Sequence, residues 1–96
     1  MEFEFNQDKS KSNKIKHGID FIGAQLLWLD KNRIEIPLKF IDEERFIIIG
    51  KIYYQYWSAI FTYRESKVRI ISVRRSRENE KEIYNSKWTW KEVWFQ

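Results

Sequence analysis

Arginine is the residue type with the clearest chemical potential in this chain of 96 residues. The segment RIISVRRSR, residues 69–77, holds four arginines among its nine residues, and Arg64 lies shortly before it. A guanidinium group stays protonated at neutral pH, and its fixed fork of N–H donors matches the oxygens of a phosphate. These arginines are therefore better suited to hold a phosphodiester, and to stabilise charge on it, than to remove a proton.

The same arginines also have an ordinary structural interpretation. Runs of charge usually lie on a solvated surface, and three acids, Glu78, Glu80 and Glu82, follow the arginines directly. Pairing between the two groups would need no ligand. Composition alone favours this interpretation, so a site needs support from further motifs.

One histidine and a group of aromatic residues offer further chemistry. His17 is the only side chain whose unperturbed pKa lies near neutrality, which makes it a candidate general acid or base. It also falls in the last turn of an expected helix, where the helix dipole favours it, and this structural role is preferred. Trp57, with Tyr53, Tyr54 and Tyr56 beside it, can stack on unpaired bases, although aromatic residues in a sheet more often build a core.

Several other chemistries lack the residues that they need. The chain has no cysteine and one histidine, so no disulfide framework, metal site or cofactor is expected. It has no phosphate-binding glycine loop and no serine in a nucleophile motif. The formal charge of +4 favours an anionic partner. No apolar run reaches the roughly 20 residues of a membrane helix, and the acidic start is unlike a signal peptide, so a cytoplasmic location is expected.

Hydrophobic periodicity predicts a single α+β domain, residues 1–85, in which helices cover an antiparallel sheet. The predicted strands lie at 3–5, 33–40, 44–54, 56–65 and 67–75, and the predicted helices at 8–18, 20–30 and 76–86. Ile15 is the only obvious apolar anchor of the first helix, and Ser76 is the expected N-cap of the last. The segment 86–96 is rich in tryptophan and has no clear period, and no function is assigned to it.

Strict alternation along the last predicted strand separates its arginines. Val68, Ile70 and Arg74 would share one face, whereas Arg75 would leave the other. Arg64, at the end of the preceding strand, would lie nearer the start of the last strand than its end. Whether Arg64 and Arg74 converge therefore depends on the curvature of the sheet.

Three segments carry a more specific pattern. They are KSKSNKIKHGIDF at 9–21, DEERFIIIGK at 42–51 and WSAIFTYRESKVRIISVRRSRENEKEIY at 57–84. In this order and length, they resemble the BrnT family of toxins from bacterial type II toxin-antitoxin systems. The resemblance implies a RelE-like microbial ribonuclease fold, with a curved antiparallel sheet, N-terminal helices and a short C-terminal helix.

The resemblance also implies an activity and the residues that perform it. It implies metal-independent RNA cleavage that inhibits translation, in which the RNA 2′-hydroxyl attacks the neighbouring phosphate and leaves a 2′,3′-cyclic phosphate. The residues carried over as catalytic are Arg64, Arg74, Arg77, His17 and Lys9. The expected RNA contacts are Arg69, Arg75, Trp57 and Tyr84.

The partners implied by the resemblance are RNA and a BrnA-like ribbon-helix-helix antitoxin. Two toxins with four antitoxins are the expected assembly, and operator DNA is reached only through the antitoxin. No membrane partner is expected. The residues alone leave two other functions open: a non-catalytic module with the same fold that binds nucleic acid or a partner, and a structural protein whose arginines pair with acids.

Overall fold

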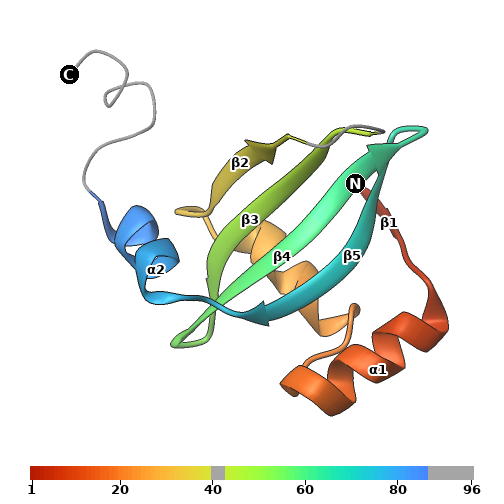
Figure 1. Ribbon diagram of the computed structural model, residues 1–96, viewed down its shortest axis with the longest axis horizontal. Coiled ribbons are helices and arrows are strands. Elements are labelled where there is room, and N and C mark those ends of the chain that lie inside the picture. The colour runs from red at the N-terminus through yellow and green to blue at the C-terminus, as the bar shows by residue number, and fades with distance from the viewer. Residues whose placement is uncertain (40–42, 87–96) are drawn as a thin grey trace.

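The computed structural model describes residues 1–39 and 43–86, and these form a five-stranded sheet with helices packed against it (Figure 1). The elements are β1 (Glu2–Glu4), α1 (Gln7–His17), the 3-10 helix η1 (Gly23–Leu29), β2 (Ile34–Leu38), β3 (Arg45–Ile52), β4 (Gln55–Arg64), β5 (Lys67–Arg75) and α2 (Glu78–Asn85). The predicted α+β class is confirmed, and every predicted element is present. Apart from Ser86, the tryptophan-rich segment lies outside the described residues. No helix in the described part of the chain is long and apolar enough to cross a membrane.

The strands lie in the order β1-β5-β4-β3-β2. The sheet is mixed, not wholly antiparallel, because β1 runs parallel to β5 while the other neighbours are antiparallel. The side-chain pattern of a three-residue edge strand carries no information on its direction, so the sequence did not predict this pairing. β2 forms the other edge and contains Pro37, which agrees with the edge position expected of a residue that cannot donate to a ladder.

Two hairpins have two-residue turns at opposite ends of the sheet (Figure 1). Between β4 and β5, Glu65 and Ser66 both have positive φ, 51° and 69°, as a type I′ turn requires. Between β3 and β4, Tyr53 has φ 58° and is followed by Tyr54. A left-handed conformation costs a bulky residue on the order of 1 kcal/mol, so Tyr53 stands where glycine would fit better.

A β-bulge in β5 changes the faces from which its side chains leave. Phe61 pairs with Ile70, but the preceding residue of β4, Ile60, pairs with Ser72, so Ile71 is an extra residue in β5. The strict alternation expected from the sequence is therefore wrong beyond Ile70. Arg74 leaves the face opposite to that of Ile70 and does not share it.

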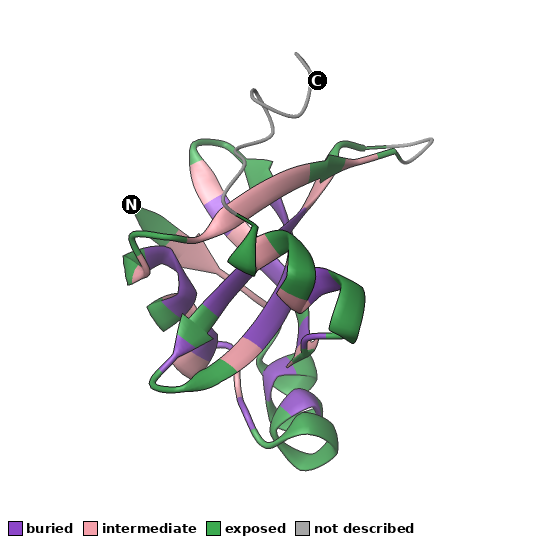
Figure 2. Ribbon diagram, turned by 90° about the vertical axis from the view of Figure 1, so that its left-hand side faces the viewer, coloured by how far each residue is buried: buried purple, intermediate pink, exposed green. Residues whose placement is uncertain are grey.

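The main core lies on one face of the sheet, under η1 and the segment that leads into it (Figure 2). Its buried members from the helical region are Phe21, Ala24, Leu27 and Trp28, which have helical spacing, and Ile19, which precedes them. The element that carries them is a 3-10 helix and not an α-helix, with hydrogen bonds from Gln25 N–H to the Ile22 carbonyl and from Asp30 N–H to the Leu27 carbonyl. Asp20, a candidate N-cap by its residue type, accepts a hydrogen bond from Gly23 N–H at 2.8 Å, but the N-cap of η1 is Ile22.

Polar side chains, not an apolar stripe, attach α1 to the sheet. Ile15 is 86% exposed, so its expected role as the anchor is wrong. Ser10 and Asn13 are the buried residues of this helix. The Asn13 amide donates to the carbonyl oxygens of Ile19 and Val73, both at 2.8 Å, and accepts from Val73 N–H at 3.2 Å. Asn13 thereby fixes the backbone of β5 one residue before Arg74.

Replacing this asparagine tests its role as the anchor. Asn13→Ala removes three hydrogen bonds and leaves buried backbone groups of Ile19 and Val73 without them, which we expect to lower the free energy of unfolding by about 3 kcal/mol. Ile15→Ala on the same helix should change it by less than about 0.5 kcal/mol. Urea unfolding measures both values, and a larger loss for Ile15→Ala than for Asn13→Ala would contradict this account of α1.

Candidate active site

Arg74 is held at the end of β5 by a two-point ion pair with Glu80 of α2. Arg74 Nη1 lies 2.7 Å from Glu80 Oε1, and Nη2 lies 2.8 Å from Oε2. Nη1 also donates to the Arg75 carbonyl at 3.2 Å. The Glu80 side chain is buried and that of Arg74 is partly buried, so this pair is far better defined than an exposed surface salt bridge.

The Glu80 carboxylate also joins the strands to the start of α2. Its Oε1 accepts from Ser58 Oγ of β4 at 3.0 Å and from Arg77 N–H at 2.8 Å. Arg77 is the N-cap of α2, so the expectation that Ser76 would occupy this position is wrong by one residue. Ser76 instead shares a 2.7 Å hydrogen bond with the Ser58 hydroxyl.

These contacts shift the ionisation of both partners. Hydrogen bonds from the Arg74 guanidinium are the main cause that lowers the pKa of Glu80 from 4.5 to about 2, against the opposing effect of burial. The bonds from Arg77 N–H and Ser58 lower it further. The hydrogen bonds with Glu80 raise the pKa of Arg74. At neutral pH, Glu80 is an ionised carboxylate of very low basicity, which suits it to hold Arg74 and not to accept a proton.

The geometry leaves one edge of the Arg74 guanidinium open. A guanidinium has five N–H donors. Two on Nη1 and one on Nη2 are used by Glu80 and the Arg75 carbonyl. The Nε–H and the second Nη2–H have no partner among the described residues. These two donors point in parallel along one edge, and such a fork matches two oxygens of a phosphate.

Arg75 and Arg77 are the other two arginines at this end of β5, and Arg75 leaves the face of the sheet opposite to that of Arg74. Arg77 is exposed at the start of α2. Arg75 is exposed and lies over the Trp57 ring, 5.3 Å from its centroid. Trp57 is only 7% exposed and belongs to the core, so its expected role in RNA stacking is restricted to the small part of the ring that remains accessible.

The remaining predicted arginines lie at the other end of the sheet. Arg64 is opposite Lys67, whereas Arg74 is opposite Ser58. Six positions of β4, roughly 20 Å of extended strand, therefore separate Arg64 from Arg74. The structure does not bring these two predicted catalytic residues together.

Acidic residues of β1 balance part of the charge at this other end. Arg69 lies 3.7 Å from Glu4, and Lys67 lies 3.9 Å from Glu2. The alternative in which the arginines pair with acids thus holds for Arg74, which binds Glu80 as the sequence allowed, and also for Arg69. The partner of Arg69 comes from β1 and not from α2.

His17 and Lys9 lie on α1, on the side that meets β5. Lys9, Asn13 and His17 are spaced by four residues, so they line one side of the helix. Asn13, in the middle, binds Val73, while Lys9 and His17 are exposed. Among the described residues, neither exposed side chain makes a hydrogen bond or an ion pair, and both remain predictions.

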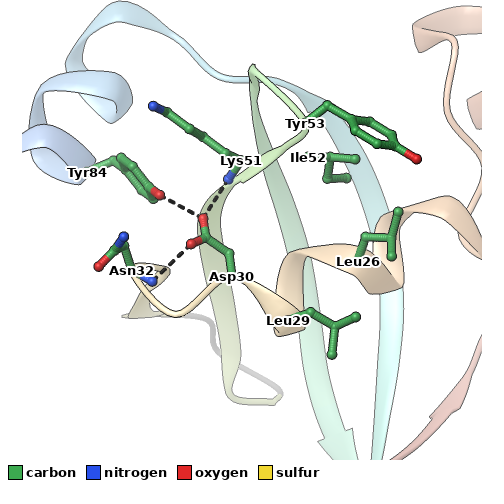
Figure 3. Close-up of a pocket in the computed structure, with 8 residues that line it drawn as sticks. All are labelled: Leu26, Leu29, Asp30, Asn32, Lys51, Ile52, Tyr53 and Tyr84. Atoms are coloured by element: carbon green, nitrogen blue, oxygen red, sulfur yellow. Dashed lines mark hydrogen bonds between the residues drawn. The ribbon is translucent and has the colours of Figure 1, made fainter.

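Tyr84 belongs to a neighbouring cluster on α2 and β3. Its hydroxyl donates to Asp30 at 2.7 Å, and Asp30 also accepts from the backbone N–H groups of Lys51 and Asn32 (Figure 3). Burial and this hydrogen bond raise the pKa of Tyr84 to about 12. Burial raises the pKa of Asp30 too, but the three hydrogen bonds outweigh it and lower the value overall. Tyr84 therefore offers a neutral ring, and its hydroxyl is already engaged.

Lys51 extends this cluster towards β4. Its ammonium lies 4.8 Å from the ring centroid of Tyr56 and 5.8 Å from that of Tyr84. A hydrogen bond with Asn85 and the charges of Lys51 and Lys81 lower the pKa of Tyr56.

No group of three or more histidine, aspartate and glutamate side chains within residues 1–39 and 43–86 is placed to hold a metal ion.

A comparison with protein-family models finds one that matches residues 5–80, described as the ribonuclease toxin BrnT of type II toxin-antitoxin systems. The chain belongs to this family. The matched region contains all five predicted catalytic residues and ends at Glu80, while Tyr84 lies beyond it. The curated proteins include no match to the sequence. BrnT membership makes the chain a ribonuclease toxin with RNA as substrate and an antitoxin as partner.

The sequence pointed to the arginines of this BrnT protein but not to the groups that position them. Glu80 was considered only as a possible surface partner, although its place three residues after Arg77 is the spacing of a capping box. The usual serine or threonine is absent from the N-cap, which hid this signal. No sequence signal marks Ser58 or Asn13, because both act through contacts between distant segments.

The acid dependence of stability tests the role of Glu80. Its pKa is lower in the folded than in the unfolded chain, so its stabilisation is present above about pH 4.5 and is lost as the pH falls towards 2. Glu80→Gln should lower the free energy of unfolding at neutral pH by on the order of 3 kcal/mol and flatten its decline in acid. Glu82→Gln, an exposed change on the same helix, is the matched control. The free energy of unfolding is measured by denaturant titration at each pH. If Glu80→Gln kept the same dependence on pH as the wild type and Glu82→Gln, the assignment would be rejected.

Proposed function

We propose that this toxin is an endoribonuclease that cleaves RNA without a metal ion. The RNA 2′-hydroxyl attacks the adjacent phosphate, and the products are a 2′,3′-cyclic phosphate and a free 5′-hydroxyl. The observation that carries the proposal is the open fork of Arg74, whose orientation is fixed by Glu80. Family membership supplies the substrate class.

Arg74 would bind the two non-bridging oxygens of the phosphate that is cleaved. The phosphorane gains negative charge as the 2′-oxygen attacks, and a donor that is already oriented stabilises this charge without reorganisation. Arg77, exposed three residues further along the chain at the start of α2, would add a second positive charge. Glu80 acts as a positioning residue, because its pKa of about 2 makes it too weak a base to take the 2′-hydroxyl proton.

The proton transfers are assigned to α1. His17 and Lys9 are the candidate acid and base, because both are exposed on the side of the helix that meets β5. Arg64, far along β4, would instead contact RNA away from the cleaved bond. Arg69 and Tyr84 would have similar binding roles.

In the cell, cleavage of cytoplasmic RNA would inhibit translation. The partner that neutralises the toxin is proposed to be a BrnA-like ribbon-helix-helix protein, in an assembly of two toxins with four antitoxins. This antitoxin would also make the contacts with operator DNA. The proposal is supported by membership of a type II toxin-antitoxin family, and co-purification of the two proteins followed by mass measurement of the complex tests its composition.

Arg74→Lys tests the catalytic assignment. Lysine keeps the charge but removes the planar fork, so we expect kcat/KM for RNA cleavage to fall on the order of 100-fold. Cleavage by the wild type should continue in the presence of a chelator. Arg33→Lys is the control, because it makes the same substitution at an arginine that pairs with Glu35 and has no role in the proposed site, and it should cleave nearly as well as the wild type.

Three results would count against this proposal. Cleavage abolished by the chelator would reject the metal-independent mechanism. Equal activity of Arg74→Lys and the wild type, with both folded, would reject Arg74 as the phosphate-binding group. Salt-sensitive RNA binding with no cleavage by the wild type would favour the alternative, a non-catalytic binding module.

A further inference from the structure

The β3–β4 turn presents two tyrosines in a way that folding does not explain. Tyr53 and Tyr54 are 86% and 93% exposed, so their rings contribute little to the core. Tyr53 is also in the left-handed region with φ 58°, where glycine or asparagine would be less strained. Strain together with exposed aromatic surface is typical of residues kept for a partner.

A groove of about 410 Å³ lies beside this turn. It is lined by Gly18, Ile19, Ile52, Tyr53, Tyr54, Gln55 and Trp57, with no acidic residue among them. A second cavity shares Ile52 and Tyr53 with it, but there the Tyr53 side chain points away from the Asp30 carboxylate (Figure 3). Tyr53 therefore lines both cavities, and its ring is turned away from the Asp30 cluster.

Two of the residues that line the groove, Gly18 and Trp57, are in contact with cationic side chains. The Lys14 ammonium donates to the Gly18 carbonyl at 3.3 Å, next to His17 and Lys16 in the last turn of α1. The second cation is Arg75, whose guanidinium lies over the Trp57 ring. Aromatic rings for stacking, with cations beside them for phosphates, form the usual combination of a single-strand binding site.

The groove is also close to the proposed active site. Trp57 and Arg75 form the register pair next to that of Ser58 and Arg74. Arg74 and Arg75 are consecutive residues that leave opposite faces at this end of the sheet, so an RNA strand that contacts both must cross the sheet here. This arrangement favours RNA over a protein as the occupant.

We infer that the groove between Gly18 and the Tyr53–Tyr54 turn is a binding subsite for an unpaired nucleotide of the RNA substrate, next to the cleaved bond. Tyr54 and Tyr53 stack on its base, and Arg75 and Lys14 contact its phosphates. The subsite makes single-stranded RNA the preferred substrate, because a paired base is not available for stacking. The inference rests on the proposed function for its location beside a cleaved bond.

RNA binding measured without cleavage tests the subsite. The probe is a short fluorescent single-stranded RNA with 2′-O-methyl groups, which cannot be cleaved by 2′-hydroxyl attack. Tyr54→Ser and Tyr53→Gly should each weaken its binding roughly tenfold, while Tyr54→Phe, which keeps the ring, should bind like the wild type. Binding of the corresponding duplex should not change among these variants.

A change of stability separates a binding role from a folding role. Tyr53→Gly relieves the strained turn, so we expect a higher Tm together with weaker RNA binding. Ser66→Gly relieves the left-handed residue of the turn at the other end of the sheet, and should raise Tm without changing RNA binding. Loss of RNA binding accompanied by a lower Tm in every tyrosine variant would overturn the inference.

The remaining outcomes are equally decisive. Tyrosine variants that bind RNA normally but lose affinity for the antitoxin would overturn the inference in favour of a protein-binding surface. If the wild type binds the probe through the tyrosines but cleaves no RNA, the proposed function fails and the subsite stands. If the wild type cleaves RNA and the variants bind and cleave like it, the subsite alone fails.

Discussion

The carboxylate of Glu80 is the group on which the arrangement of the site depends. It is bound by a guanidinium from β5, a hydroxyl from β4 and an N–H at the start of α2. A single buried side chain therefore fixes the position of the helix on the sheet and the direction of Arg74. Because a buried ion must be fully hydrogen-bonded to be tolerated, few other arrangements of these three elements are compatible with it. As a consequence, Glu80 and the Arg75 carbonyl occupy three of the five donors of the Arg74 guanidinium, and only one edge remains for a ligand.

The charge of the protein is distributed unevenly between the two ends of the sheet. At the β4–β5 turn, the glutamates of β1 lie beside Lys67 and Arg69 and reduce the local positive charge. At the opposite end, Arg75, Arg77 and Lys51 are exposed. The acids near them are already engaged: Glu80 by Arg74, Asp30 by Tyr84 and the Lys51 N–H, and Glu78 by Lys81. An approaching polyanion is therefore attracted to the end that carries the open fork. The modest formal charge of +4 conceals this difference.

Residue patterns were sufficient to predict most of the fold. Alternating apolar residues located β2, a continuous apolar run located β3, and helical spacing of Phe21, Ala24 and Leu27 located the buried side of η1. The bulge at Ile71 was not predictable, since no residue type there signals it, and it moved Arg74 to another face. The attachment of α1 was missed because a buried asparagine looks like any surface polar residue until its distant partner is known.

The candidate site was predicted only in part, for a similar reason. The cluster of arginines in the sequence indicated which segment could form a site. Which arginines lie close together, however, depends on the register of β4 and β5, and this register separates Arg64 from Arg74. The groups that support Arg74 come from α1, β4, β5 and α2. Contacts between segments so far apart in the sequence leave no local pattern that could predict them. The family resemblance pointed to Arg64 and Arg74 together, whereas the register places them at opposite ends of the β4–β5 hairpin.

The amide of Asn13 has a consequence for how this chain meets other chains. β1 pairs with β5 only as far as Arg69, so beyond that point β5 would present an unprotected edge. Asn13 satisfies both backbone groups of Val73, as a residue of an adjoining strand would, and on the opposite edge Pro37 cannot donate to a ladder. Each margin of the sheet is thus made a poor template for strand addition, which limits self-association through backbone pairing.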